Sequence, residues 1–273
     1  MSRGLGDVYK RQGAEPDVQA AAGEARPDRP LLRETLARLA HEDPAAGARV
    51  LTGLLPALGL AIEGPLDLDL VLAEGGVLAV SVEDGATTVR PLDRPRSRRG
   101  ADARLSAAAA PLADLLAGHG PAPRRFTGPL RLTGRRRDRA RAALAALPGG
   151  APGLAAAVAA GARVEPADVW RLLALAVDPA WTRGHAFTVA QEVTGEGGGT
   201  WYLTASDDGL AAGGTPPPEG EPAAAVTLSR AALDAMLRGE DAPAGERPRV
   251  RGDRAAVALL KEWMDRVRGA AAA

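Results

Sequence analysis

Residues 66–85 read LDLDLVLAEGGVLAVSVEDG, and this stretch decides the fold. Its leucines alternate with aspartates, which is the period of two shown by a β-strand with one buried face. A Gly75-Gly76 turn follows, and then a second apolar segment at 77–82 that ends in Asp84-Gly85, a pair typical of tight hairpin turns. We therefore expect a hairpin of antiparallel strands, with room for a third strand after the Asp-Gly turn.

The same pattern recurs in the second half of the chain. Residues 185–193 (HAFTVAQEV) alternate in the same way, and a second strand at 200–205 leads to another Asp-Gly turn. Upstream, Pro44 and Pro166 each open an apolar helix, a position that favours proline, and they lie 122 positions apart. The pattern predicts a tandem repeat.

The repeat continues downstream of the hairpins. An apolar helix ends before Gly118 in the first copy and before Gly239 in the second, and glycine is the expected left-handed stop just past a helix. A short strand and a closing helix follow, the helices being expected at 135–147 and 253–268. This order predicts an α+β protein of two tandem units, each a small, mainly antiparallel sheet with helices packed on one face.

The repeat also divides the chain into segments. We assign residues 30–148 to the first unit and 149–273 to the second. Residues 1–29 are a lead-in: 1–12 (MSRGLGDVYKRQ) resemble a translated sequencing-adapter or cloning junction, and the rest carries Pro, Gly and charge without periodic apolar content. We exclude this lead-in from reasoning about the fold.

Composition narrows the possible partners. The 34 basic and 34 acidic side chains cancel, so the molecule has no bulk field that would attract nucleic acid or anionic lipid. The absence of cysteine excludes disulfides and thiolate chemistry, and it fits the reducing cytoplasm, where we expect the protein. The apolar runs fall far short of the ~20 residues of a transmembrane helix, and we expect neither a membrane span nor a secretory signal.

The second copy resembles the sterol carrier protein family of lipid-binding domains. The resemblance rests on a sheet hairpin, the L-x-x-[LM]-[LM]-x-G helix at 233–239, a strand that ends in Gly252-Asp253 and a last amphipathic helix. It covers residues 185–268 and, more faintly, 66–147, where Arg135 stands in place of the aspartate. It implies an apolar tunnel between sheet and helices that holds a fatty acyl chain, acyl-CoA or sterol-like molecule without catalysis.

We expect such a tunnel mainly in the second unit, lined by inward-facing side chains of its strands and helices. These tunnel residues are Phe187, Val189, Trp201, Leu203, Met236, Leu237, Leu260 and Met264. The alternative is that they fill a solid core, because periodicity identifies an inward face but not an empty one. The protein would then be a structural or regulatory interaction module without a ligand.

The sequence offers no catalytic constellation. His41, His119 and His185 show no HxxxH or HExxH spacing, and no serine lies in a G-x-S-x-G elbow. The glycine-rich segment 195–199 lies between two expected strands and lacks the Lys-Ser/Thr of a phosphate-binding loop. We expect a non-enzyme with no catalytic residue, no metal and no cofactor.

Arginines cluster in the first copy. This cluster could bind anionic lipid headgroups, CoA phosphates or nucleic acid, or it could be a solvated loop and helix face. We do not expect nucleic acid, because Phe126 alone interleaves with the arginines for base stacking. The members of the cluster are Arg94, Arg96, Arg98, Arg99, Arg124, Arg125, Arg135, Arg136, Arg137, Arg139 and Arg141.

Overall fold

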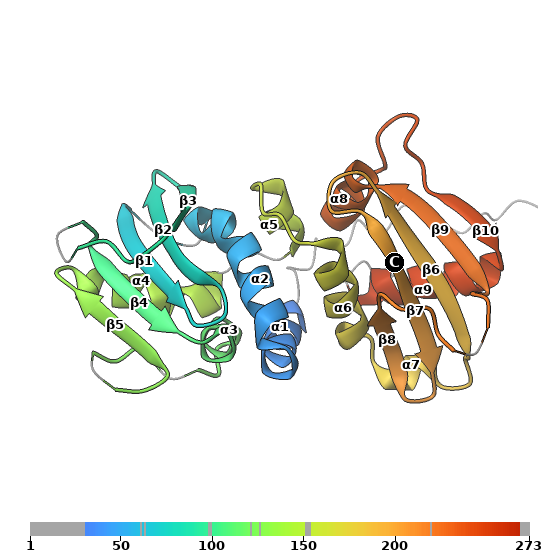
Figure 1. The fold of residues 1–273 in the computed structure, drawn as a ribbon, viewed down its shortest axis with the longest axis horizontal. Helices are drawn as coiled ribbons and strands as arrows, with labels where there is room; N and C mark the ends of the chain where they lie inside the picture. The colour runs from blue at the N-terminus through green and yellow to red at the C-terminus, as the bar shows by residue number, and fades with distance from the viewer. Residues whose placement is uncertain are drawn as a thin grey trace, which may run out of the picture.

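A computed structural model of the chain confirms an α+β fold with two sheet-containing units (Figure 1). The lead-in of residues 1–29 lies outside the described part of the chain, so its assignment stays a prediction. The predicted boundary between residues 148 and 149 falls in the last turn of the helix at Arg137–Gly150, and it also stays a prediction. The structure describes residues 31–60, 62, 64–97, 100–120, 122–125, 127–150, 154–218 and 220–267.

The first unit begins with two helices and a 3-10 turn, followed by strands that alternate with the remaining helices. The elements are α1 (Leu31–Glu42), α2 (Pro44–Leu54), η1 (Leu55–Leu60), β1 (Leu66–Leu72), β2 (Gly76–Glu83), β3 (Ala86–Leu92), β4 (Ala103–Ala107), α3 (Ala109–Ala117), β5 (Leu130–Gly134) and α4 (Arg137–Gly150).

The second unit repeats this order, with the short helix α7 in the place of η1 before its sheet. The elements are α5 (Leu154–Ala159), α6 (Pro166–Ala176), α7 (Pro179–Thr182), β6 (Phe187–Thr194), β7 (Gly199–Ser206), β8 (Gly209–Gly213), β9 (Ala224–Ser229), α8 (Arg230–Arg238), β10 (Arg249–Gly252) and α9 (Arg254–Val267).

The two sheets share one topology. Their orders are β3-β2-β1-β4-β5 and β10-β9-β6-β7-β8, and in both the first and fourth strands of the unit pair in parallel while the other pairings are antiparallel. The third strand that the sequence left open is present in each unit. Figure 1 shows α4 and α9 crossing behind their sheets, and no helix of the described residues covers the opposite face of either sheet.

Equivalent glycines fix equivalent turns in the two units. Gly118 and Gly239 end α3 and α8 with φ of 85° and 76°, which confirms the predicted left-handed stops. Gly134 and Gly252 end β5 and β10 with φ of 129° and 82°. A Cβ at either of these two would lie 2.6 or 2.4 Å from backbone atoms of the neighbouring segment, so only glycine fits.

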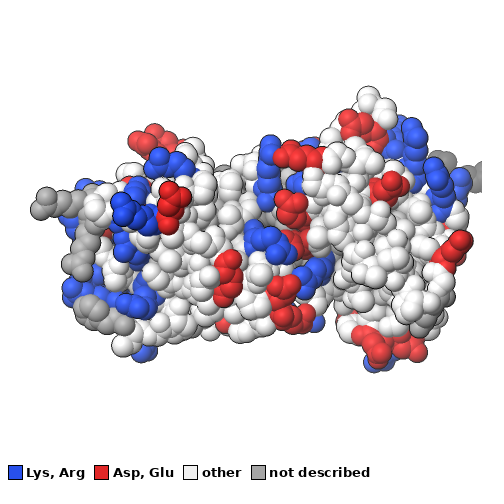
Figure 2. Space-filling model, in the orientation of Figure 1, with Lys and Arg blue, Asp and Glu red and all other residues white. Residues whose placement is uncertain are grey.

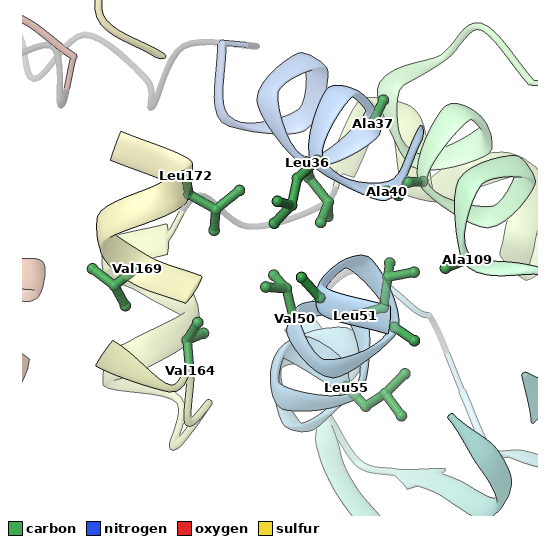
Figure 3. Close-up of a cluster of buried hydrophobic side chains, with 14 of the residues drawn as sticks. Leu36, Ala37, Ala40, Val50, Leu51, Leu55, Ala109, Val164, Val169 and Leu172 are labelled. Atoms are coloured by element: carbon green, nitrogen blue, oxygen red, sulfur yellow. The ribbon is translucent and has the colours of Figure 1, made fainter. Parts of the chain in front are cut away.

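An apolar core joins the two units. Helix α1 of the first unit packs on α6 of the second, and Figure 3 shows Leu36 facing Leu172 and Val50 lying opposite Val164 across this junction. All four side chains are buried. The sequence analysis predicted two units but no shared core between them.

Ion pairs cross the junction in a reciprocal pattern. Arg49 donates two hydrogen bonds to Asp168 at 2.8 and 3.0 Å, and Arg171 donates one to Asp43 at 2.7 Å. The two arginines lie 122 positions apart and hold equivalent places in α2 and α6. Arg49 therefore reaches the first turn of α6, and Arg171 reaches the N-cap residue of α2, so each unit contacts the start of the other unit's helix. The hydrogen bonds to Asp168 raise the pKa of the Arg49 guanidinium.

Candidate functional site

The eight tunnel residues predicted in the second unit do come together. All of them belong to one hydrophobic cluster, in which five are buried and Phe187, Trp201 and Met236 are partly buried. Phe187 also stacks on Trp263 of α9, with ring centroids 5.7 Å apart. This cluster extends through both units and includes the junction between them, so it places the eight side chains in the common core. The ligand they were expected to hold stays a prediction.

One buried polar group in this unit was missed by the sequence analysis. Trp170 of α6 is 2% exposed, and its indole Nε1 finds no hydrogen-bond acceptor among the described residues. A buried donor without an acceptor costs about 1–3 kcal/mol, so such groups are rare in folded proteins. Nothing in the sequence pattern signals it, because Trp170 occupies an ordinary inward position of its helix.

A pocket of about 490 Å3 lies on the helix-free face of the first sheet. The strand register places Asp69, Arg104 and Thr133 side by side across β1, β4 and β5, and these three form one row of its floor. Ser106 and Arg131, paired across β4 and β5, form the next row. We call this site the arginine pocket.

Positive charge dominates the arginine pocket. Five guanidinium groups against one carboxylate leave its lining with a formal charge of +4. Figure 2 shows basic side chains gathered over the β4–β5 end of the first unit. The charged lining residues are Arg104, Arg125, Arg131, Arg135, Arg137 and Asp69.

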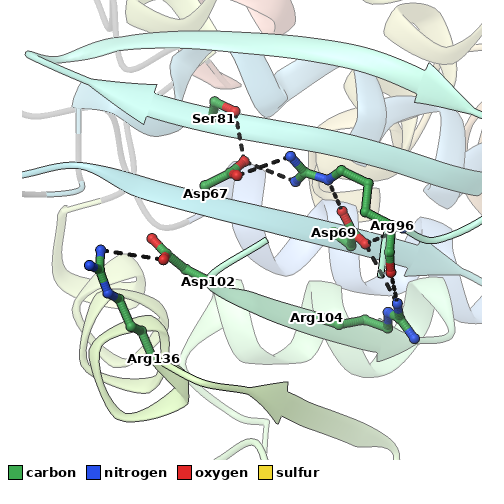
Figure 4. Close-up of polar contacts among 7 residues, drawn as sticks. All are labelled: Asp67, Asp69, Ser81, Arg96, Asp102, Arg104 and Arg136. Atoms are coloured by element: carbon green, nitrogen blue, oxygen red, sulfur yellow. Dashed lines mark hydrogen bonds and ion pairs between the residues drawn. The ribbon is translucent and has the colours of Figure 1, made fainter. Parts of the chain in front are cut away.

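The single carboxylate of the pocket is already engaged. Asp69 is 1% exposed and accepts hydrogen bonds from Arg96 Nε at 2.6 Å and from the Arg96 backbone N–H at 2.7 Å (Figure 4). The other guanidinium nitrogens of Arg96 donate to Asp67 at 2.9 and 3.0 Å. Arg96 thereby ties the β3–β4 loop down on the helix-free face and neutralises much of the charge of Asp69.

Arg104 is the central arginine of the floor. One of its terminal nitrogens donates to the backbone carbonyl of Arg96 and lies 3.7 Å from Asp69. Its Nε is buried and has no acceptor in the part of the chain that the structure describes. The Arg104 side chain is nevertheless 34% exposed, so part of its guanidinium-bearing side chain is open to the pocket.

The predicted arginine cluster contributes only part of this site. Arg125, Arg135 and Arg137 line the pocket, whereas Arg136 is paired with Asp102 at 3.3 Å. Arg98, Arg99 and Phe126 lie outside the described residues.

Two of the five pocket arginines, Arg104 and Arg131, were missed by the sequence analysis. Their signal was present in the alternation of β4 and β5, where each arginine neighbours a buried leucine and so points to the opposite face.

The histidines serve other roles. His41 Nε2 lies 3.0 Å from Asp114, and His185 meets Trp263 edge-on with ring centroids 5.8 Å apart. A search of the described residues finds no group of three metal-ligating side chains placed to share an ion. Nor does any helix in those residues have the length and apolar character that a bilayer crossing requires.

Comparisons with known proteins identify no family. No protein-family model and no curated protein matches the chain. Among solved structures, a double mutant of the sec-alkyl sulfatase PisA1 aligns with a TM-score of 0.33 at 20% identity, covering 47% of this chain and 21% of the sulfatase. The inverting sec-alkylsulfatase Pisa1 from Pseudomonas sp. aligns with 0.31 at 18%, covering 47% and 23%. Likeness at this level carries no argument about activity.

Proposed function

We propose that this protein binds, without catalysing a reaction, a small molecule with an anionic group, and that the arginine pocket holds that group. The observation that carries the proposal is the lining of five arginines against one neutralised carboxylate. Hydrogen bonds between guanidinium and an anion contribute about 1.5–3 kcal/mol each, and planar guanidinium groups suit phosphate and carboxylate oxygens.

The chemistry of the lining supports binding without catalysis. The lining includes the hydroxyls of Ser97, Ser106 and Thr133 but no histidine. Asp69 is the one carboxylate, and its hydrogen bonds to Arg96 leave it poorly placed to accept a proton from a ligand. A base that is already committed to a cation contributes little to general acid–base catalysis.

A titration of the full chain tests this proposal. We expect laurate or inorganic phosphate to bind in isothermal calorimetry, whereas uncharged dodecanol should not bind at the pocket. Replacing Arg131, an exposed pocket residue, by Met should weaken anion binding about tenfold or more. The proposal fails if neither anion binds, or if Arg131→Met binds both as tightly as the unaltered protein.

A second candidate is an apolar ligand in the second unit: a fatty acid, an acyl-CoA or a sterol-like molecule. The observation that favours it is the buried, unsatisfied Nε1 of Trp170, which belongs to the same cluster as the tunnel residues. Native mass spectrometry of the purified protein would detect a retained lipid, and Trp170→Phe should reduce its occupancy. A chain that carries no lipid and ignores fluorescent fatty acids would favour the interaction-module alternative for this unit.

For compartment, we propose the cytoplasm, because a chain without cysteine suits a reducing environment.

A further inference from the structure

We infer that the ligand of the arginine pocket is a phosphate ester of a hydroxyl-bearing small molecule, with at least two negative charges, and not a monocarboxylate such as a fatty acid. This inference rests on the proposed function and narrows it to a ligand class. Three features of the pocket support it: its charge, its directed hydrogen-bond donors and its hydroxyl groups.

Charge is the first feature. The lining carries +4, and Asp69 is partly neutralised by Arg96. Arg131 and Arg135 have no carboxylate within ion-pairing distance among the described residues, and Arg137 has only Asp138 at 3.7 Å. One carboxylate would leave most of these cations unscreened at close range, whereas a phosphate ester brings close to two charges and three acceptor oxygens.

The floor also offers directed donors. The buried Nε of Arg104 lacks an acceptor, and Arg131 lies one strand away in the next row of the floor. Helix α4 begins at Arg137 beside the pocket, so the positive end of its dipole adds to the same field. A phosphate ester offers three acceptor oxygens arranged in three dimensions, whereas a carboxylate offers two oxygens in one plane.

The rest of the lining suits a polar molecule. Hydroxyls come from Ser97 in the β3–β4 loop, Ser106 in β4 and Thr133 in β5. The lining has no large apolar side chain, and its apolar residues are Ala101 and Ala103. A volume of about 490 Å3 fits a compact ligand.

The second unit provides an internal comparison. At the positions equivalent to Asp69 and Arg104, the second sheet has Ala190 and Ala225. Arg249 of β10 occupies the place of Arg131, because Arg131 pairs with β4 and Arg249 pairs with β9 at the equivalent register. The Asp69–Arg104 pair at the floor is therefore a property of the first unit alone, whereas Arg249 and Arg251 hold the places of Arg131 and Thr133 on the second sheet. Arg249 is a matched control for Arg131.

Calorimetric titration of the full chain at constant low salt tests the inference with three probes: butyrate, glycerol phosphate and inorganic pyrophosphate. We expect glycerol phosphate and pyrophosphate to bind at least tenfold tighter than butyrate, with affinities that fall as salt is added. Arg131→Met should weaken glycerol phosphate about tenfold, and Arg249→Met should leave its affinity unchanged.

A second variant tests geometry apart from charge. Arg104→Lys keeps the positive charge but loses the Nε donor, so we expect about a tenfold loss for glycerol phosphate. Equal unfolding midpoints for Arg131→Met and Arg249→Met would show that loss of binding is not loss of folding.

The possible outcomes separate the two proposals. If butyrate binds as tightly as glycerol phosphate, the phosphate inference is overturned and the anion-binding function stands. If none of the anions binds, the phosphate inference and the anion-binding function are both overturned. If Arg249→Met weakens binding as much as Arg131→Met, the ligand does not occupy the arginine pocket, and both are overturned as well.

Discussion

Asp69 shows how a single residue departs from its strand pattern. Alternation with buried leucines predicts that it faces solvent, yet it is 1% exposed because the β3–β4 loop crosses that face and Arg96 binds it. The sequence could place Asp69 on the correct face of β1. It could not reveal the covering loop, because that contact joins residues 27 positions apart through a segment without periodicity.

Replacing Asp69 by Asn should therefore destabilise the protein. The change removes the charge that compensates Arg96, whose side chain is largely buried, and breaking such a pair costs about 3 kcal/mol. Urea unfolding measures the difference. Asp138→Asn, which removes an exposed carboxylate paired with Arg141, should change stability by less than about 1 kcal/mol. Equal effects of the two substitutions would contradict the structural role assigned to Asp69.

The charge of Asp43 makes the stability of the folded protein depend on pH. Asp43 accepts a hydrogen bond from the Ala46 backbone N–H and another from Arg171, which together hold its pKa below the ordinary value. A lowered folded-state pKa means that the carboxylate stabilises the fold above its unfolded pKa of ~3.9 and loses this effect as pH falls through the folded value.

We therefore expect Asp43→Asn, which retains an N-cap acceptor, to be less stable than the unaltered protein near pH 7. The gap should close as the pH falls below about 4. Urea unfolding midpoints of both proteins between pH 7 and pH ~3 measure this difference in stability. A gap that stays constant with pH would mean that the charge of Asp43 contributes nothing.

At the scale of elements, glycines specify where strands and helices end. The sequence predicted the helix stops at Gly118 and Gly239 because glycine favours the left-handed region. It also predicted the hairpin at Asp84-Gly85, where both residues have positive φ. It did not predict the parallel pairing of β1 with β4, because strand order depends on contacts between distant segments and not on local propensity.

Gly134→Ala should be strongly destabilising. A Cβ at this position would meet the backbone of Ala103 and Asp102 at 2.6 Å, and its φ of 129° is strained for any other residue. We expect a loss of about 2 kcal/mol or more in unfolding free energy. Gly214→Ala, where nothing lies within 4 Å, should change it by less than about 0.5 kcal/mol. An unchanged free energy of unfolding for Gly134→Ala would contradict the close backbone approach at the end of β5.

For the whole molecule, the junction between the two units is tightly packed, and we expect the units to unfold as one cooperative body. Gly53 of α2 lies so close to the second unit that a Cβ there would be 2.1 Å from the Arg163 carbonyl oxygen. The Arg163 N–H donates in turn to the Gly53 carbonyl at 3.1 Å. Sequence analysis divided the chain correctly into two sheet-containing units, but helical periodicity cannot tell which apolar face meets another unit.

Gly53→Ala should therefore uncouple the units. We expect the single thermal transition of the unaltered protein to broaden or divide into two in calorimetry, because the added methyl forces the junction apart. Gly214→Ala serves again as the control and should retain one transition. A single, unshifted transition for Gly53→Ala would contradict a tight junction.

The central claim is that an anionic ligand binds the first unit at its helix-free sheet face. Hydrogen–deuterium exchange of the full chain, with and without glycerol phosphate, tests it most directly because it locates the contact. We predict slower exchange in 101–107 and 130–137, which line the pocket, and no change in the equivalent segments 222–229 and 249–254. Protection confined to the second unit, or no protection anywhere, would contradict the claim.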